Sequence, residues 1–315
     1  MRIAIVGAGA VGGYFGGRLA AAGSDVVLVA RGRHHEALRK LGLRLESPNG
    51  DLHIHRVHAT DDTTTIGAVD AVLFTVKLYD ADAAAALLPS LIGADTIVVP
   101  FQNGVDAVDL LTRAVGRSHV GAGVAYVAAV VSEPGVVRHT AMDHLIFGEL
   151  DGVRSPRLER LLKACEAAGF QATLSDRIEV DLWAKFVRLA VFSGMTSVTR
   201  TPIGPLRDDP DLWAMFQAAV LEGMAVARAK GIALPAAVFD EIGAMAQSLP
   251  ASAKSSMLED LERGRRLELP WLSGALVRIG REVDVETPIH RFIATVLKPH
   301  VDGRQPSGQA VLAAR

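Results

Sequence analysis

The chain has 315 residues, of which 50% are hydrophobic and 22% charged, and this length predicts two domains, each large enough to bury its own core. Its formal net charge of −2 at pH 7 gives no indication of a strongly basic protein, so we expect no nucleic-acid partner. The single cysteine, Cys165, excludes an internal disulfide and is expected to be a small buried apolar side chain.

The N-terminal half alternates between apolar runs and helical patterns. "RIAIVG" (2–7) and "DVVLVAR" (25–31) are expected to be buried strands, and "VGGYFGGRLAAAG" (11–23) the helix between them. Further strands are expected at 71–77, 96–104 and 120–131, and helices at 80–92 and 105–115. This alternation predicts a Rossmann-type doubly wound parallel sheet with helices on both faces.

The strand signals nearly stop after "HLIFGEL" (144–150), and amphipathic helical patterns follow. They lie at 155–169, 177–199, 210–231, 235–248, 252–264 and 268–283. The prediction is an α/β protein with an N-terminal Rossmann domain (1–174) and a second, all-helical domain (175–315). The helix at 155–169 and the segment 170–176 could still belong to the first sheet.

Glycines interrupt the apolar N-terminus, and no apolar run reaches the roughly 18 residues that span a bilayer. We therefore expect no membrane partner and a cytoplasmic protein.

The hexapeptide "GAGAVG" (7–12) lies between the first strand and the first helix. Gly7 permits a tight turn, Gly9 lets a pyrophosphate approach the backbone, and Gly12 lets the helix pack closely on the strand. The free N–H groups at the start of the helix would face the phosphates. The pattern predicts a dinucleotide site, and the alternative is a glycine-rich turn without a ligand.

The end of the second strand indicates which dinucleotide binds. It reads "LVARGR", with no Asp or Glu at 28–33 to accept hydrogen bonds from the ribose 2′-hydroxyl of NAD. Arg31 and Arg33 instead offer planar donor groups suited to a 2′-phosphate. This predicts NADP(H), unless both arginines are simply solvated surface residues.

Three polar side chains stand where chemistry is plausible. Lys77 and Asn103 each follow a predicted parallel strand, at the edge where ligands bind, although both could be ordinary turn residues. Lys185 lies within a helical apolar stripe. It could extend to water, or, if desolvated, it could protonate an alkoxide that forms when a ketone is reduced.

Two clusters of histidine, "HHE" (34–36) and "LHIHRVH" (52–58), raise the question of a metal site. His53 and His55 would share one face of a strand, but no acidic or cysteine partner stands at ligand spacing. We expect a solvated hairpin here and no metal ion.

The combined motifs resemble the ketopantoate reductase (2-dehydropantoate 2-reductase) family along the whole chain. The matching pieces are "GAGAVG", "VKLYD", "QNGVD", "EPGVVRHT", "DLWAKFV", "SSMLEDLERGRRLEL" and "VETPIHRFIATVLK". The resemblance implies reduction of 2-dehydropantoate to pantoate with NADPH, a step toward coenzyme A. It also implies a Rossmann domain, an all-helical domain and an active site between the two.

The resemblance also implies roles for individual residues. The catalytic pair would be Lys185, the proton donor two residues after Trp183, and Glu268, which would also contact the cofactor. Cofactor contacts would come from Gly7, Ala8, Gly9, Ala10, Val11, Gly12, Arg31, Lys77 and Asn103. Substrate contacts would come from Asn103, Lys185, Leu189, Ser193 and Ser256.

The chain departs from the family at three of its polar positions. Leu189 and Ser193 stand where the family typically has asparagines, four and eight residues after the lysine, and Ser273 replaces another asparagine. Losing an amide that binds a polar substrate would cost about 1–3 kcal/mol.

The leading prediction is therefore a reductase of a small 2-keto acid, with ketopantoate first among them. One alternative is a relative that reduces a more apolar keto acid or carbonyl compound. The other alternative is a dinucleotide-binding sensor without activity. Helical domains of this kind often pair, so a homodimer is the oligomer to test.

Overall fold

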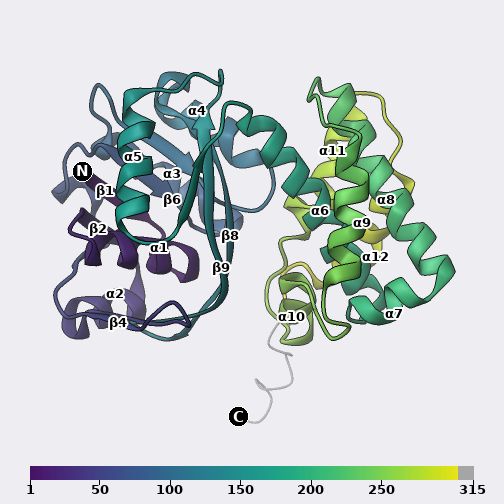
Figure 1. The fold of residues 1–315 in the computed structure, drawn as a ribbon, viewed down its shortest axis with the longest axis horizontal. Coiled ribbons are helices and arrows are strands. Elements are labelled where there is room, and N and C mark those ends of the chain that lie inside the picture. The colour runs from purple at the N-terminus through teal and green to yellow at the C-terminus, as the bar shows by residue number, and fades with distance from the viewer. Residues whose placement is uncertain (304–315) are drawn as a thin grey trace, which may run out of the picture. The chain divides into compact units, whose positions relative to one another are not determined.

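A computed structural model of the chain describes residues 1–303 and divides into two compact units (Figure 1). The first unit consists of Met1–Gln102 and Asp106–Leu182. The second consists of Asn103–Val105 and the chain from Trp183 onward. A short segment after a strand of the first unit is thus counted with the second.

The first unit contains a five-stranded parallel sheet with the strand order β5-β2-β1-β6-β7. Its strands are β1 (Arg2–Val6), β2 (Asp25–Val29), β5 (His58–Thr60), β6 (Ala71–Phe74) and β7 (Ile97–Pro100). The chain runs from β1 outward to β2 and β5, and then returns to β6 on the other side of β1. This order confirms the predicted Rossmann-type sheet and places its ligand-binding edge at the carboxyl ends of β1 and β6.

A second sheet in the same unit was not predicted. Its strands are β3 (Leu43–Glu46), β4 (Leu52–Ile54), β8 (Gly121–Glu133), β9 (Val136–Glu149) and β10 (Gln171–Leu174). Their order is β10-β9-β3-β4, and β8 pairs with β9 in an antiparallel hairpin. The segment expected as a strand at 120–131 meets the parallel sheet only at its start, where Val120 forms an isolated parallel bridge with Val98 of β7, and from Gly121 onward it pairs with β9 instead. An apolar run shows that a strand is buried but not which strand pairs with it.

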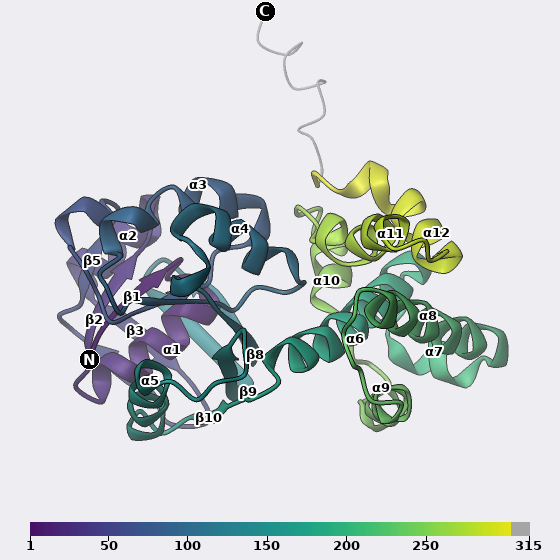
Figure 2. The same cartoon turned by 90° about the horizontal axis from the view of Figure 1, so that it is seen from above.

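Helix α1 (Ala10–Ala21) packs against strands of both sheets (Figure 2). A Cβ atom added to Gly16 would lie 2.7 Å from Ile5 Cγ1 of β1, and one added to Gly13 would lie 2.8 Å from Val137 Cγ2 of β9. Larger side chains at these positions would force the helix off one sheet or the other. The repeated glycine pairs in this helix therefore serve packing on two sides.

The remaining helices of the first unit differ in length from the predicted ones. They are α2 (Gly32–Leu41), α3 (Ala81–Ala85), α4 (Asp106–Val115) and α5 (Pro156–Ala167). The helix expected at 80–92 is only α3, followed by the 3₁₀ turn Leu88–Leu91. Pro89 lies in that turn and has no backbone N–H to continue an α-helix.

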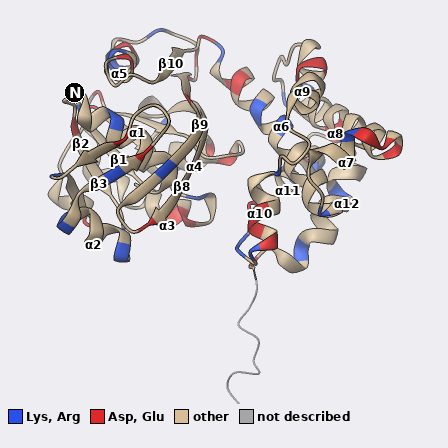
Figure 3. Ribbon diagram, turned by 60° about the horizontal axis from the view of Figure 1, so that its bottom comes forward, with Lys and Arg blue, Asp and Glu red and all other residues tan. Residues whose placement is uncertain are grey.

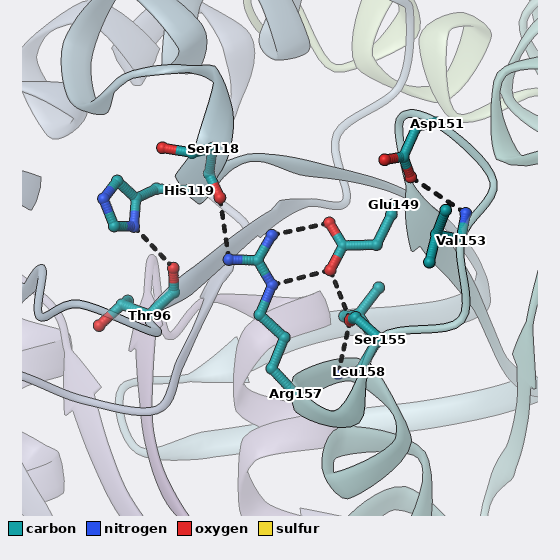
Figure 4. Close-up of polar contacts among 9 residues, drawn as sticks. All are labelled: Thr96, Ser118, His119, Glu149, Asp151, Val153, Ser155, Arg157 and Leu158. Atoms are coloured by element: carbon teal, nitrogen blue, oxygen red, sulfur yellow. Dashed lines mark hydrogen bonds and ion pairs between the residues drawn. The ribbon is translucent and has the colours of Figure 1, made fainter.

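A partly buried ion pair joins the end of β9 to the start of α5 (Figure 4). The Arg157 guanidinium donates to both carboxylate oxygens of Glu149, each at 2.7 Å, and to the Ser118 carbonyl at 2.9 Å. The Ser155 hydroxyl donates to the same carboxylate at 2.6 Å. Because charge-assisted bonds from a planar guanidinium fix orientation, this contact holds α5 to the second sheet.

The second unit is all-helical, as predicted. Its helices are α6 (Ile178–Thr199, whose first turn belongs to the first unit), α7 (Ile203–Asp208), α8 (Pro210–Ala229), α9 (Ala237–Ser248), α10 (Ser256–Glu262), α11 (Ser273–Glu282) and α12 (Pro288–Leu297). They share one apolar core, to which α6 contributes Phe186, Val187, Ala190 and Val191. Within residues 1–303, no helix combines the length and the apolar character needed to cross a membrane.

Acidic and basic residues are both scattered over the helices of this unit (Figure 3). Near α10, Lys254 pairs with Glu262 at 2.7 Å and Arg263 with Glu259 at 3.3 Å. The charged side chains at 262–266 are exposed, so this part of the charge run lies at a solvated surface, where such pairs add little stability.

Candidate functional site

The glycine loop after β1 has the shape of a dinucleotide cradle. Gly7 has a φ of +99°, and a Cβ atom there would lie 2.6 Å from the backbone nitrogen of Val76. Gly12 has no space for a Cβ either, because it would overlap Thr75 Oγ1. A Cβ atom at Gly9, by contrast, would meet nothing closer than 4.0 Å. The space above Gly9 is thus open to a ligand.

Helix α1 begins directly after this loop and offers free backbone donors. It starts at Ala10, and its N-cap residue, Gly9, makes no side-chain capping bond. The first N–H groups of a helix have no partner within the helix, so those of Ala10, Val11 and Gly12 are available to an anion. These residues and the open space at Gly9 fit the pyrophosphate of a dinucleotide.

Two side chains that the sequence did not indicate as cofactor residues hold carbonyl groups of this loop. Thr75 Oγ1 donates to the Gly7 carbonyl at 2.8 Å, and His34 Nε2 contacts the Ala8 carbonyl at 2.8 Å. His34, which the sequence suggested only as part of the "HHE" cluster, follows Arg31 by one turn, and this spacing is the signal that could have indicated a place near the cofactor.

Two predicted cofactor residues lie at the carboxyl edge of the parallel sheet. Arg31 follows β2 as the N-cap of α2, and Lys77 follows β6 before the 3₁₀ turn Leu78–Asp80. Both residues are exposed. Along residues 1–303, no acidic side chain forms an ion pair with Arg31 or Arg33.

In the second unit, Asn103 joins the two residues predicted to be catalytic. Lys185 Nζ donates to Asn103 Oδ1 at 3.1 Å, and Asn103 Nδ2 donates to Glu268 Oε2 at 3.2 Å. Gly104, with a φ of +92°, forms the turn that follows the asparagine. The three residues come from the segment after β7, from helix α6, and from the position before the 3₁₀ turn Leu269–Trp271. We call them the Lys-Asn-Glu triad.

Burial sets the electrostatics of this triad. Lys185 is 7% exposed and Glu268 is 6% exposed. Desolvation, followed by the positive charge of Arg188, lowers the pKa of Lys185 to about 7, although the carboxylate of Glu268 acts in the opposite direction. A lysine that titrates near neutral pH can give up a proton and take it back during turnover, which an ordinary surface lysine cannot do efficiently.

The other predicted substrate residues occupy different environments. Leu189, one turn after Lys185 on α6, is half-buried against the core of the unit. Ser193 is only 2% exposed, so it lies within the core. Ser256 is exposed in the first turn of α10, whereas its neighbour Ser255 is buried and caps that helix. The structure thus joins Lys185, Asn103 and Glu268 but shows no contact from Ser193 or Ser256 to them.

Ser273, which replaces an asparagine of the family, belongs to a buried polar chain. His290 Nε2 donates to the Ala219 carbonyl at 3.0 Å, so its Nδ1 accepts from the Ser273 hydroxyl at 3.2 Å. Burial lowers the pKa of His290 to about 4, which keeps the ring neutral. Ser273 therefore holds α11 and α12 together.

The cysteine and the histidine clusters show no sign of a reactive site. Cys165 is fully buried, and desolvation raises the pKa of its thiol to about 12. His53 lies in the β3–β4 hairpin, bonds the Leu41 carbonyl at 3.1 Å and packs against His55. Residues 1–303 contain no group of three or more histidine, cysteine or acidic side chains that could hold a metal ion.

Two family descriptions match nearly all of the described chain. "Ketopantoate reductase PanE/ApbA" matches residues 3–152, and "Ketopantoate reductase PanE/ApbA C terminal" matches residues 177–301.

Individual relatives agree with this match. The 2-dehydropantoate 2-reductase of Mesorhizobium japonicum is 33% identical over 309 residues, covering 91% of this chain and 94% of that protein. The crystal structure of a PanE/ApbA family ketopantoate reductase from Ralstonia eutropha is 35% identical, with a TM-score of 0.87 over 95% of this chain and 98% of that one. D-mandelate dehydrogenase, in a ternary structure with NADH and anilino(oxo)acetate, shares the fold with a TM-score of 0.86 at 23% identity, covering 95% of this chain and 98% of that one.

Proposed function

Because the chain belongs to the ketopantoate reductase family, and is thus an oxidoreductase that uses a nicotinamide dinucleotide, we propose that it reduces a 2-keto acid with NADPH. The substrate proposed first is 2-dehydropantoate, which would be reduced to pantoate as a step toward coenzyme A. The observation that carries the proposal is the Lys-Asn-Glu triad, which holds a lysine of lowered pKa in a buried hydrogen-bonded chain.

When bound, the reduced cofactor would supply the hydride that the carbonyl carbon of the substrate accepts. The ammonium group of Lys185 donates a proton to the carbonyl oxygen, so that the product is a 2-hydroxy acid. Asn103 orients the lysine, because its amide oxygen accepts from Nζ while its amide nitrogen is held by Glu268. Glu268 also favours the charged form of Lys185, which is the form that donates.

The cofactor would be held by the glycine loop, with residues 1–174 as its domain and 175–315 as the substrate domain. The pyrophosphate would lie on the N–H groups of Ala10, Val11 and Gly12, and Arg31 would bind the 2′-phosphate of NADP. Lys77 would contact the cofactor from the end of β6. A cytoplasmic location and a homodimer remain predictions from the sequence.

A panel of 2-keto acids tests this function. Purified protein is expected to oxidise NADPH when ketopantoate or a related 2-keto acid is added, and the rate is measured from the loss of nicotinamide absorbance. Tight NADPH binding without turnover of any panel member would contradict the proposal and favour the sensor.

A second candidate function follows from Leu189. This residue stands one turn from Lys185 on the same helix face and has no hydrogen-bonding group. A hydroxyl group of the substrate placed beside it would lose its hydrogen bonds to water without replacement, at a cost of about 1–3 kcal/mol. The preferred substrate would then be a 2-keto acid with an apolar side chain. The D-mandelate dehydrogenase ligand anilino(oxo)acetate has an aromatic group, which fits such a preference on this fold.

One pair of compounds distinguishes the two candidate functions. Ketopantoate and 3,3-dimethyl-2-oxobutanoate differ only by the hydroxyl group, and if Leu189 selects against that group, the second compound has the higher kcat/KM. Leu189→Asn is then expected to raise kcat/KM for ketopantoate about tenfold. Leu189→Met keeps an apolar side chain of similar volume and should leave the preference unchanged. A Leu189→Asn variant with unaltered selectivity would show that this residue does not set specificity.

A further inference from the structure

We propose that His34 is a positioning residue that holds the glycine loop in the conformation that binds the cofactor pyrophosphate. This inference rests on the proposed dinucleotide binding and adds to it a residue outside the loop. His34 lies in the first turn of α2 and is half-buried.

The two hydrogen bonds of the ring define its protonation. The backbone N–H of Gly135 donates to His34 Nδ1 at 3.1 Å, so Nδ1 carries no hydrogen. The hydrogen is therefore on Nε2, which donates to the Ala8 carbonyl at 2.8 Å. The imidazole is neutral and connects the glycine loop to the turn between β8 and β9. Burial lowers the pKa of His34, in agreement with a neutral ring.

The turn that holds Nδ1 is itself fixed. Gly135 has a φ of +83° and is buried, and its carbonyl accepts from Arg44 N at 2.9 Å. A Cβ atom there would lie 3.2 Å from Ala37 Cβ of α2. The "EPG" motif thus gives His34 a rigid support.

The loop needs this support because glycines flank Ala8 on both sides. Glycine restricts the backbone least, so the peptide groups on either side of Ala8 can rotate at little cost. The carbonyl of Gly7 is held by Thr75, and that of Gly9 accepts from Gly13 N at 2.8 Å. His34 holds the remaining carbonyl, that of Ala8. With all three oxygens engaged within the protein, none is free to turn toward an incoming phosphate, which it would repel.

The pyrophosphate is common to NADP and NAD, so His34 should affect both cofactors equally. Arg31, in contrast, would act only on the 2′-phosphate. The ratio of the two dissociation constants therefore separates the role of His34 from the choice of cofactor.

Three substitutions of His34 distinguish the effects of the two hydrogen bonds that its ring makes. His34→Gln places an amide N–H near the position of Nε2 and can still donate to Ala8. His34→Asn places its amide near the position of Nδ1 and can accept only from Gly135. His34→Ala loses both bonds. His55→Ala removes an exposed histidine elsewhere in the same unit and serves as the control.

The dissociation constants of NADPH and NADH are measured by nicotinamide fluorescence, and the melting temperature of each free protein by calorimetry. Loss of the Ala8 contact is expected to weaken both cofactors about tenfold in His34→Asn and His34→Ala, and at most about twofold in His34→Gln. The NADH to NADPH ratio and the kcat at saturating cofactor should not change. His34→Asn and His34→Gln should melt within about 2 °C of each other, so that stability does not explain their difference.

Equal dissociation constants in wild type and His34→Ala would overturn the proposal. So would rescue by asparagine but not by glutamine, since the Gly135 contact would then be the one that matters. A wild-type protein that binds neither dinucleotide would overturn the proposed function itself, and the role of His34 with it. The proposal is supported if His34→Ala and His34→Asn bind both cofactors weakly while His34→Gln does not.

Discussion

Replacing Lys185 by methionine is expected to lower kcat for keto acid reduction by about a thousandfold, because general acid catalysis by a positioned group contributes about 10²- to 10⁴-fold. The dissociation constant of NADPH should stay within about threefold of wild type, since the glycine loop is unaltered. Rates and cofactor binding are measured on the same preparations. Lys230→Met, which changes an exposed lysine of the second unit, should retain full activity.

The same variant should be more stable than wild type at pH 7. Lys185 has a lower pKa in the folded protein, about 7, than its ordinary value of 10.5, so the folded state binds fewer protons than the unfolded state between these values. Its contribution to stability therefore falls as the pH drops from 10.5 to 7, by up to about 5 kcal/mol. Loss of the bond to Asn103 offsets part of the gain, and a net increase of roughly 2 kcal/mol in the free energy of unfolding is expected. Substantial turnover by Lys185→Met would refute the assigned role, whatever its stability.

Replacing Arg31 by alanine is expected to weaken NADPH binding by about 30-fold and to leave NADH binding within about twofold. A guanidinium bound to a phosphate contributes roughly 2 kcal/mol through charge-assisted hydrogen bonds, and NADH has no 2′-phosphate to lose this contact. Titrations of both cofactors at constant ionic strength give the two dissociation constants.

Arg39→Ala, at the other end of α2, removes the same exposed charge and is the matched control. It should change neither dissociation constant by more than about twofold. If Arg31→Ala weakens NADPH and NADH equally, the arginine does not select the cofactor, and the preference for NADP inferred from "LVARGR" is wrong.

The first strand, helix and strand could be predicted because their signals are local. Apolar runs end at Gly7 and at Arg31, and the glycines of α1 mark close packing. The second sheet could not be predicted, because the pairing of β9 with β3 joins segments about ninety residues apart in the chain. The prediction of a helix over 80–92 was too long for a local reason, because Pro89 does not continue an α-helix.

The candidate site likewise combines residues that the local sequence indicated with contacts between distant segments that it could not indicate. Lys185 and Asn103 could be selected because each is a polar residue at a position where chemistry is plausible. Their places in the sequence do not predict, however, that either of them lies close to Glu268. Only the resemblance to a family named the three residues together, and the structure shows how Asn103 connects the other two. The sequence drew attention to His34 only as part of the "HHE" cluster and a possible metal site, because its two hydrogen-bond partners are 26 and 101 residues away in the chain.

The pH dependence of reduction tests the central claim most directly, namely that Lys185 is the proton donor and titrates near neutral pH. With NADPH saturating, kcat/KM for the keto acid is measured from pH 5.5 to 9.5 in the wild-type protein. Only the protonated lysine can donate, so the value should be constant below the pKa of about 7 and fall about tenfold for each pH unit above it. A profile that stays flat up to pH 9, or that rises with pH, would contradict the account.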